Sequence, residues 1–217
     1  MKNKIIITIS ALLMFIAIYI VYTNTDNYKF ASEYNSLNGK KTESGKTYLT
    51  TDIKTNNVKY TSYKEVFDIL DGKTGIIYFG FPECPWCRNA LPVLLEAAGD
   101  QTIYYFNNKE DRDTKELLED GTVKTTKEST KDYKKLIEKL GDFADTYDGL
   151  NDENIKRLYY PTVLFVKNGK IIDKIDGTVD SQKDPYKPLT SNQTKELKEK
   201  YQNAISKMQT CSNDEKC

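Results

Sequence analysis

Short apolar runs alternate along the chain with polar breaks that contain glycine, asparagine or proline. The runs rich in β-branched and aromatic residues predict strands at 47–53, 76–81, 102–106, 160–166 and 171–175. Asn168-Gly169 separates the last two runs, which is a strong signal of a β-hairpin. Capping patterns and apolar positions at helical spacing predict helices at 62–70, 85–98, 131–147 and 190–208. This order indicates an α/β fold, with a central mixed sheet flanked by helices.

The longest apolar run, Ile5–Tyr22, stands at the N-terminus and would span roughly 27 Å as a helix. Lys2 and Lys4 precede it, so the positive-inside rule places the N-terminus in the cytoplasm and exports the remainder. A cleaved signal peptide is the alternative, although small residues of the A-x-A kind are missing after the run. We expect an N-terminal transmembrane helix within residues 1–24, a membrane anchor or uncleaved signal.

The rest of the chain divides by composition. Residues 25–46 are polar and predict a tether, within which Tyr28–Leu37 could form a short helix. Residues 47–210 contain the predicted strands and helices and form the folded domain. Residues 211–217 are a tail that contains cysteine.

Composition limits the chemistry. Lys and Arg number 32 and Asp and Glu number 32, so the basic excess typical of a nucleic-acid surface is missing. The chain contains no histidine, which excludes Ser-His and Cys-His nucleophile pairs and the usual zinc sites with histidine. We expect no metal, no cofactor and no nucleic-acid partner.

Cys84-Pro85-Trp86-Cys87 follows a buried strand and opens a helix. Cys84 would lie at the N-cap with Pro85 at the first helical position, which tolerates a missing N–H group. The free N–H groups and the helix dipole there favour a thiolate on Cys84, the attacking species in disulfide exchange, and Cys87 can resolve the mixed disulfide. Half of a zinc site and a purely structural disulfide are the alternatives.

Further residues carry a family resemblance. The segment Tyr78–Gly99 with Pro92, the Tyr160-Pro161-Thr162 strand with its hairpin, and Gly177 together resemble the thioredoxin-like superfamily over residues 47–208. Within it the chain is most similar to bacteriocin transport accessory proteins and extracytoplasmic thiol–disulfide oxidoreductases of Gram-positive bacteria.

The resemblance implies a thioredoxin-like fold in which Pro161 is cis and lies against the sulfur of Cys84. It implies that Tyr160 and Trp86 contact the substrate, and that a helical insertion between about Asp111 and Leu158 precedes the cis-proline strand.

The chain departs from the family pattern near the cysteines. Tyr78 stands where cytosolic thioredoxins have a buried Asp, and Glu83 stands where they have Trp. Glu83 is a candidate modulator of Cys84, by like-charge repulsion or as a proton carrier, and a solvated surface glutamate is the simpler interpretation. Pro85 belongs to a dipeptide that tunes the redox potential.

Cys211 and Cys217 follow the last predicted helix. A structural disulfide between them is expected in an exported protein, with free or intermolecular thiols and an electron relay to Cys84–Cys87 as alternatives.

These features predict a membrane-anchored extracytoplasmic thiol–disulfide oxidoreductase, single-pass in the cell membrane. Its catalytic residues would be Cys84, Cys87 and Pro161, and its partners would be thiols or disulfides of exported proteins and a membrane redox protein. The alternative is a binding module or secretion accessory factor in which the disulfide is structural. The direction of electron flow stays open.

Overall fold

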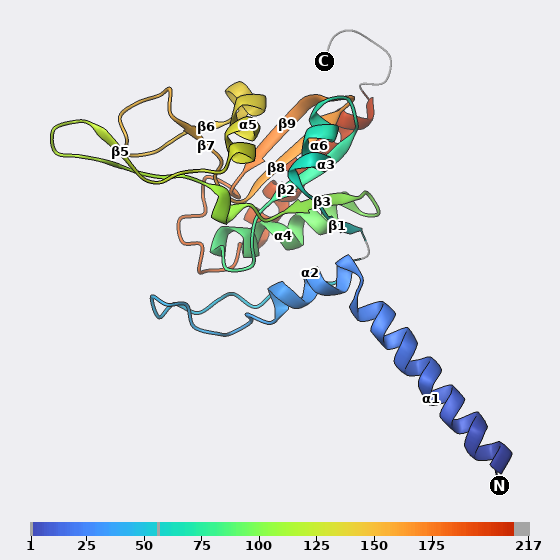
Figure 1. Cartoon of the computed structure of the whole chain (residues 1–217). Helices are drawn as coiled ribbons and strands as arrows, with labels where there is room; N and C mark the ends of the chain where they lie inside the picture. Colours follow the sequence, from blue (N-terminus) through green and yellow to red (C-terminus); the bar gives the residue numbers. More distant parts are fainter. Residues whose placement is uncertain (1, 56, 211–217) are drawn as a thin grey trace.

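The computed structural model describes residues 2–55 and 57–210, with side chains described between residues 12 and 209 apart from residue 56. Its centre is a mixed five-stranded sheet of order β1-β3-β2-β8-β9 (Figure 1). β1 and β2 run parallel to β3, whereas β8 is antiparallel to β2 and β9 is antiparallel to β8. The bounds are β1 Val58–Tyr60, β2 Gly75–Phe79, β3 Ile103–Phe106, β8 Thr162–Lys167 and β9 Lys170–Asp176. The predicted central mixed sheet is confirmed.

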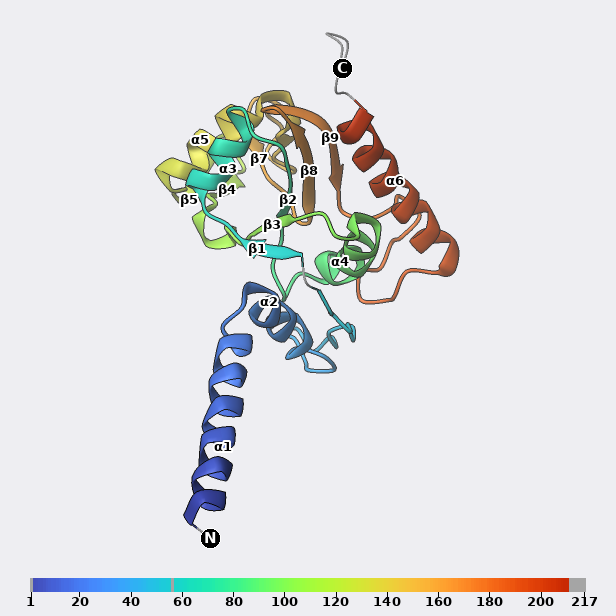
Figure 2. The ribbon, with the colours of Figure 1, turned by 90° about the vertical axis from the view of Figure 1, so that its right-hand side faces the viewer.

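Helices cover both faces of the sheet (Figure 2). α4 (Pro85–Ala98) and α6 (Ser191–Thr210) pack on one face, and α3 (Tyr63–Leu70) and α5 (Lys131–Leu140) pack on the other. Every residue of β2 is buried, and its side chains alternate between the two cores. Tyr78 belongs to the α4–α6 core, and Ile77 and Phe79 belong to the α3–α5 core.

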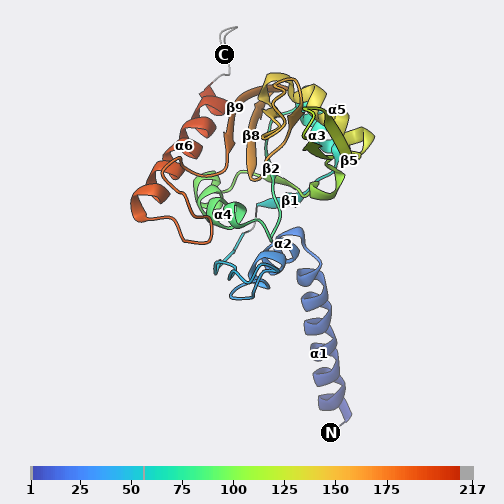
Figure 3. The same cartoon turned by 90° about the vertical axis from the view of Figure 1, so that its left-hand side faces the viewer.

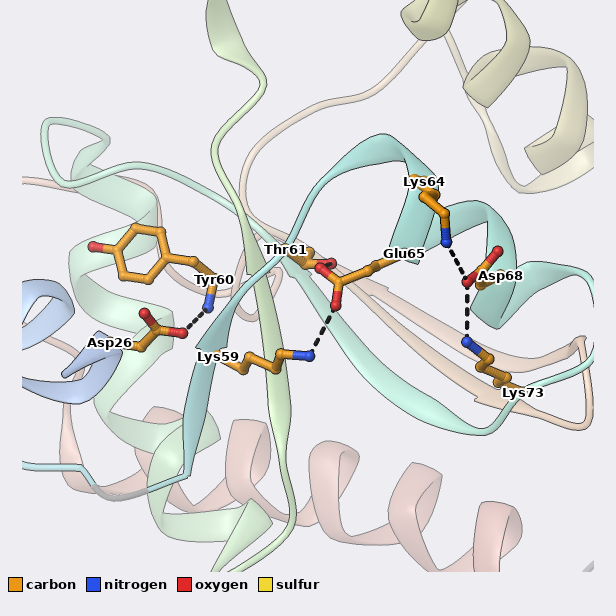
Figure 4. A network of polar contacts seen from close by, with 8 residues as sticks. All are labelled: Asp26, Lys59, Tyr60, Thr61, Lys64, Glu65, Asp68 and Lys73. Atoms are coloured by element: carbon orange, nitrogen blue, oxygen red, sulfur yellow. Dashed lines mark hydrogen bonds and ion pairs between the residues drawn. The ribbon is translucent and has the colours of Figure 1, made fainter.

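Local signals account for several element boundaries. Thr190 and Gln193 form the predicted capping box at the start of α6, with N–H···O distances of 2.9 and 3.3 Å. Asn168 and Gly169 both have positive φ, 48° and 80°, as the turn between β8 and β9 requires. The capping box expected at Ser62 does not form. Glu65 instead binds the Lys59 ammonium and accepts a hydrogen bond from the hydroxyl of Thr61 (Figure 4).

The predicted strand at 47–53 is wrong, and the first strand of the sheet is β1. Residues 47–53 form no regular strand. The backbone of Tyr48 pairs with that of Gly39 and Lys40, at 3.3 and 3.0 Å, and side chains bind the backbone from Leu49 to Ile53. The Asn38 side chain accepts from the N–H of Thr51 at 2.9 Å, and the Asn35 side chain accepts from the N–H of Ile53 at 3.0 Å. β-Propensity alone could not distinguish these two ways of pairing the backbone.

The predicted tether at 25–46 is wrong in its first half, because α2 (Asp26–Asn35) packs on the domain. The short helix considered possible at Tyr28–Leu37 does form, with slightly earlier bounds. Phe30 and Tyr34 lie one turn apart on this helix and are fully buried in the α4–α6 core. The Asp26 carboxylate accepts from the backbone N–H of Tyr60 at 3.0 Å (Figure 4), and the Asn27 side chain accepts from that of Val58 at 2.9 Å. These side chains cover the free edge of β1, so the folded unit begins near residue 26.

The insertion before β8 contains one α-helix and two hairpins, which corrects the helical insertion that the resemblance implied. Its hairpins are β4 (Thr114–Leu117) with β5 (Val123–Lys127), and β6 (Asp145–Thr146) with β7 (Lys156–Arg157). Short 3-10 turns lie at η1 (Lys109–Asp111) and η2 (Gly141–Phe143). The predicted helix at 131–147 ends at Leu140, because Gly141 adopts a left-handed φ of 52°.

α1 (Lys2–Thr23) projects away from the domain and continues into α2 (Figure 3). Within the described part of the chain, no helix has the length and apolarity needed to span a membrane. The predicted span includes residues 5–11, whose side chains lie outside that part. Cys211 and Cys217 also lie outside the described residues.

Candidate redox site

Cys84 occupies the N-cap of α4, as the sequence predicts, with Pro85 in the first turn. Its sulfur accepts a hydrogen bond from the backbone N–H of Cys87 at 3.1 Å. Proline at this position costs the helix no hydrogen bond, because the first N–H groups of a helix have no partner within it. The helix therefore begins at the sulfur, where its free N–H groups and dipole stabilise negative charge.

The segment before β8 lies against the same sulfur. The Cys84 thiol donates to the carbonyl oxygen of Tyr160 at 3.6 Å, and the Tyr160–Pro161 peptide bond is cis. Cys84 and Cys87 are both free thiols in this structure, and their exposed fractions are 5% and 0%. The structure thus brings together Cys84, Cys87, Tyr160 and Pro161, which the sequence analysis selected.

Cys87 is held in its neutral form. Burial raises the pKa of the Cys87 thiol well above its usual value, and the neighbouring Cys84 raises it further. Phe81 and Tyr78 lower the pKa of this thiol, but burial and Cys84 outweigh them. The two sulfurs therefore have different environments. The Cys84 sulfur caps α4, and the Cys87 sulfur is a buried neutral thiol.

Two tyrosine side chains belong to the same buried core as Cys87. The hydroxyl oxygens of Tyr34 from α2 and Tyr78 from β2 are hydrogen-bonded at 2.9 Å, and both residues are fully buried. Burial raises the pKa of both well above 10, so both stay neutral at physiological pH. Sequence reasoning noted Tyr78 but missed Tyr34, because the polar segment around it indicated a tether. The useful signal was the aromatic pair Phe30 and Tyr34 at i, i+4 spacing.

A groove of about 320 Å³ lies beside Tyr160, the residue whose carbonyl oxygen contacts the Cys84 sulfur. Trp86 and Tyr160, the predicted substrate contacts, both line it. The other lining residues are Tyr159, Asp176, Gly177, Thr178, Val179, Asp180 and Gln182. The groove is open and has aromatic residues in its walls, so it can accommodate an extended peptide segment.

Glu83, the residue before Cys84, lies at the surface with 46% of its side chain exposed. Its carboxylate pairs with the Lys109 ammonium at 3.1 Å. Lys109 also lies over the ring of Phe81, at 4.9 Å from its centroid, and this ring packs edge-on against Tyr160. The positive partner offsets the charge of Glu83, which agrees with the simpler interpretation of a surface glutamate.

Arg88 joins α4 to the N-terminal segment. Its side chain follows Cys84 by one helical turn and is only 2% exposed. The guanidinium donates to the carbonyls of Leu49, Tyr34 and Pro82 at 2.5–3.2 Å. It also donates to the side-chain oxygen of Asn38 at 2.6 Å. One buried residue therefore fixes both the N-terminal segment and the loop that precedes Cys84.

The described residues contain no group of three or more His, Cys, Asp or Glu side chains that could hold a metal ion. The two further cysteines that a zinc site would use, Cys211 and Cys217, lie outside those residues.

Comparison with known proteins gives no match for this chain, whether against protein-family models, curated proteins or solved structures.

Proposed function

We propose that this chain is a thiol–disulfide oxidoreductase of thioredoxin-like fold, with Cys84 as nucleophile and Cys87 as resolving thiol. The observation that carries the proposal is the position of the Cys84 sulfur. It caps α4, accepts the N–H of Cys87 at 3.1 Å and faces the Tyr160 carbonyl at 3.6 Å. An attacking thiolate needs stabilised charge and an approach for its substrate, and this geometry supports both.

The exchange runs in two steps. The Cys84 thiolate attacks a substrate disulfide, so a Cys84–substrate bond forms and the other substrate sulfur leaves as a thiolate. Cys87 then gives its proton to a solvent base and attacks the Cys84 sulfur, which releases the second substrate thiolate. The two electrons of the dithiol have then reduced one substrate disulfide, and the reverse sequence oxidises a substrate dithiol.

The groove beside Trp86 and Tyr160 is the proposed position of the substrate chain. The Tyr160 backbone precedes β8, so an extended peptide there could pair with it as one strand pairs with another. An open groove with a mixed polar and aromatic lining suits partly unfolded protein segments better than a small, enclosed ligand.

Localisation at the cell membrane is part of the proposal and rests on the sequence. The apolar run Ile5–Tyr22 and the preceding lysines support an anchor with the domain on the extracytoplasmic face. Exported proteins are then the substrates, and a membrane redox protein restores the working state of the cysteine pair.

The test is the reduction potential of the cysteine pair in the full chain, in detergent, with Cys211→Ser and Cys217→Ser. The protein is equilibrated in glutathione buffers and its free thiols are alkylated. Mass spectrometry then gives the fraction of protein in which the cysteine pair is reduced. A potential near roughly −120 mV would assign a disulfide donor, and one near roughly −270 mV a reductase. A pair that never exchanges with glutathione would overturn the proposal and favour a binding module with a structural disulfide.

A further inference from the structure

Three loops meet at the end of the sheet where the cysteine pair lies. β2 and β3 are parallel and end in register, and the antiparallel strand β8 begins at the same edge. The loop after β2 carries Cys84, and Tyr160 belongs to the loop that enters β8. The third loop is residues 108–112, which follow β3 and include η1. Its side chains contact both of the other loops.

The ring of Tyr160 is held by this third loop. Its hydroxyl donates a hydrogen bond to the side-chain oxygen of Asn108 at 2.7 Å, and Asn108 is only 1% exposed. The Arg112 guanidinium lies over the face of the same ring, 4.4 Å from its centroid, and donates to the carbonyl oxygen of Leu158 at 3.2 Å. A tyrosine side chain has only two χ angles, so contacts at its hydroxyl and its face also restrict the backbone that carries it.

The third loop also holds the chain that leads into Cys84. The Lys109 ammonium pairs with the Glu83 carboxylate and lies over the ring of Phe81. The Phe81 ring in turn packs edge-on against the ring of Tyr160, with centroids 5.3 Å apart. The loop therefore fixes the segments on both sides of the 3.6 Å contact between the Cys84 sulfur and the Tyr160 carbonyl oxygen.

We infer that Asn108 and Arg112 are positioning residues of the exchange reaction with peptide substrates. They hold the ring of Tyr160, and through it the backbone on which a substrate chain lies beside the Cys84 sulfur. The inference rests on the proposed function and deepens it, because it assigns the loop after β3 to the alignment of extended peptides.

Alignment of this kind predicts a difference between classes of disulfide. Holding two reactants in the correct relative geometry accelerates their reaction, and a small misplacement loses much of that gain. A peptide disulfide bound along the Tyr160 backbone depends on that geometry. A small disulfide without a peptide bond needs only access to the Cys84 sulfur, so it gains nothing from the position of Tyr160.

The test compares two such disulfides as oxidants of the reduced full chain in detergent, with Cys211→Ser and Cys217→Ser. One is the disulfide-linked dimer of an unstructured peptide, and the other is hydroxyethyl disulfide. Acid quenching and mass spectrometry give the oxidised fraction of the protein against time, and hence a second-order rate constant for each disulfide. Asn108→Ala and Tyr160→Phe should each lower the rate constant for the peptide at least about threefold, because each removes the same hydrogen bond. The rate constant for hydroxyethyl disulfide should stay unchanged.

Two further variants sharpen the test. The double variant Asn108→Ala, Tyr160→Phe should react with the peptide no more slowly than the slower single variant, because the two residues act through one hydrogen bond. Arg112→Lys keeps the positive charge but loses the planar group over the Tyr160 ring. It should also slow the reaction with the peptide alone.

Tyr105→Phe is the matched control for Tyr160→Phe, because its buried hydroxyl has no hydrogen-bond partner within the described residues. It should keep both rate constants of the parent protein. Tyr160→Phe keeps the ring and loses one oxygen atom, so it decides the matter if Asn108→Ala does not fold.

Separate outcomes contradict the inference and the proposed function. Folded variants at Asn108 and Tyr160 that react as the parent does, that slow equally with both disulfides, or whose losses add in the double variant overturn the inference alone. An Arg112→Lys variant that reacts as the parent does overturns the role of Arg112. A parent protein that neither disulfide oxidises overturns the proposed function instead.

Discussion

The Cys84 sulfur and the Tyr160 carbonyl oxygen lie 3.6 Å apart, although 76 positions separate the two residues in the chain. The contact exists because β2 and β8 are antiparallel neighbours. The chain leaves β2 towards Cys84 at the same end of the sheet at which it enters β8 from Pro161. The sheet thus places the Cys84 sulfur beside the backbone on which we propose that a substrate chain lies.

The packing of α2 predicts how far the N-terminus can be shortened. Deleting residues 1–23 should leave the fold intact, because Thr25, which caps α2 by accepting from the N–H of Tyr28, is kept. Deleting residues 1–46 removes Phe30 and Tyr34 from the core, and each such loss costs about 3–5 kcal/mol. Urea unfolding should show cooperative folding for the shorter deletion alone. Equal stability of the two proteins would show that residues 25–46 are a tether after all.

Arg88→Met should destabilise the protein by about 2–4 kcal/mol, because buried carbonyls lose their donor and each costs about 1–3 kcal/mol. Limited proteolysis should then cut the segment between α2 and β1 faster than in the parent protein. Lys64→Met is the control, since this lysine is 83% exposed and its ion pair with Asp68 contributes about 0–1 kcal/mol. Similar unfolding free energies for the two variants would contradict the role assigned to Arg88.

Gly80→Ala should cost about 1–3 kcal/mol, the usual penalty for overpacking a core. Its Cβ atom would meet Tyr78 at 2.5 Å, where the backbone of β2 leaves the ring little freedom. Gly75→Ala is the comparison, because its Cβ atom would meet the ring of Tyr104 at 3.0 Å and this partly exposed side chain can move. Denaturant unfolding should rank Gly80→Ala as the more destabilised protein, and the reverse order would refute the close fit around Tyr78.

The buried thiol of Cys87 predicts a loss of stability of the reduced protein in alkali. Burial raises its folded-state pKa well above 9.0, so above pH 9 the unfolded state releases a proton that the folded state keeps. The contribution of Cys87 to the free energy of unfolding is fully present below pH 9. Above pH 9 it falls by about 1.4 kcal/mol per pH unit, until the pH reaches the folded-state pKa of the thiol.

Cys87→Ala provides the reference for that measurement, since it keeps the buried tyrosines and their own titration. The difference in unfolding free energy between the reduced parent protein and this variant should change between pH 8 and pH 10 in favour of the variant. A difference that stays constant over this range would show that Cys87 is not a buried neutral thiol.

The features of the fold that depend on neighbouring residues in the chain could be predicted from the sequence. The uninterrupted apolar run of β2, the Asn168-Gly169 turn and the capping box of Thr190 each depend on residues close in the chain, and each forms as predicted. The N-cap position of Cys84 follows in the same way from the strand before it and from Pro85. The position of the cysteine pair at the start of α4 could therefore be predicted from the sequence alone.

Features that depend on distant partners were not predictable. The polar composition of α2 conceals that Phe30 and Tyr34 are buried in the core. Thr51 and Ile53 depend on Asn38 and Asn35 for backbone hydrogen bonds. The contact of Tyr34 with Tyr78 joins positions 44 apart. The i, i+4 spacing of Phe30 and Tyr34 could therefore indicate a buried helix face, but not the residues that this face contacts.

The most direct test of the account is the reaction of the reduced full chain with oxidised glutathione, followed by mass spectrometry in the Cys211→Ser, Cys217→Ser background. The parent protein should end as an intramolecular disulfide without bound glutathione. Cys87→Ser should accumulate one glutathione on Cys84, because the resolving thiol is gone, and Cys84→Ser should react far more slowly, because Cys87 is buried and protonated. Equal labelling of both single variants, or no labelling of either, would contradict the assignment of Cys84 as the nucleophile.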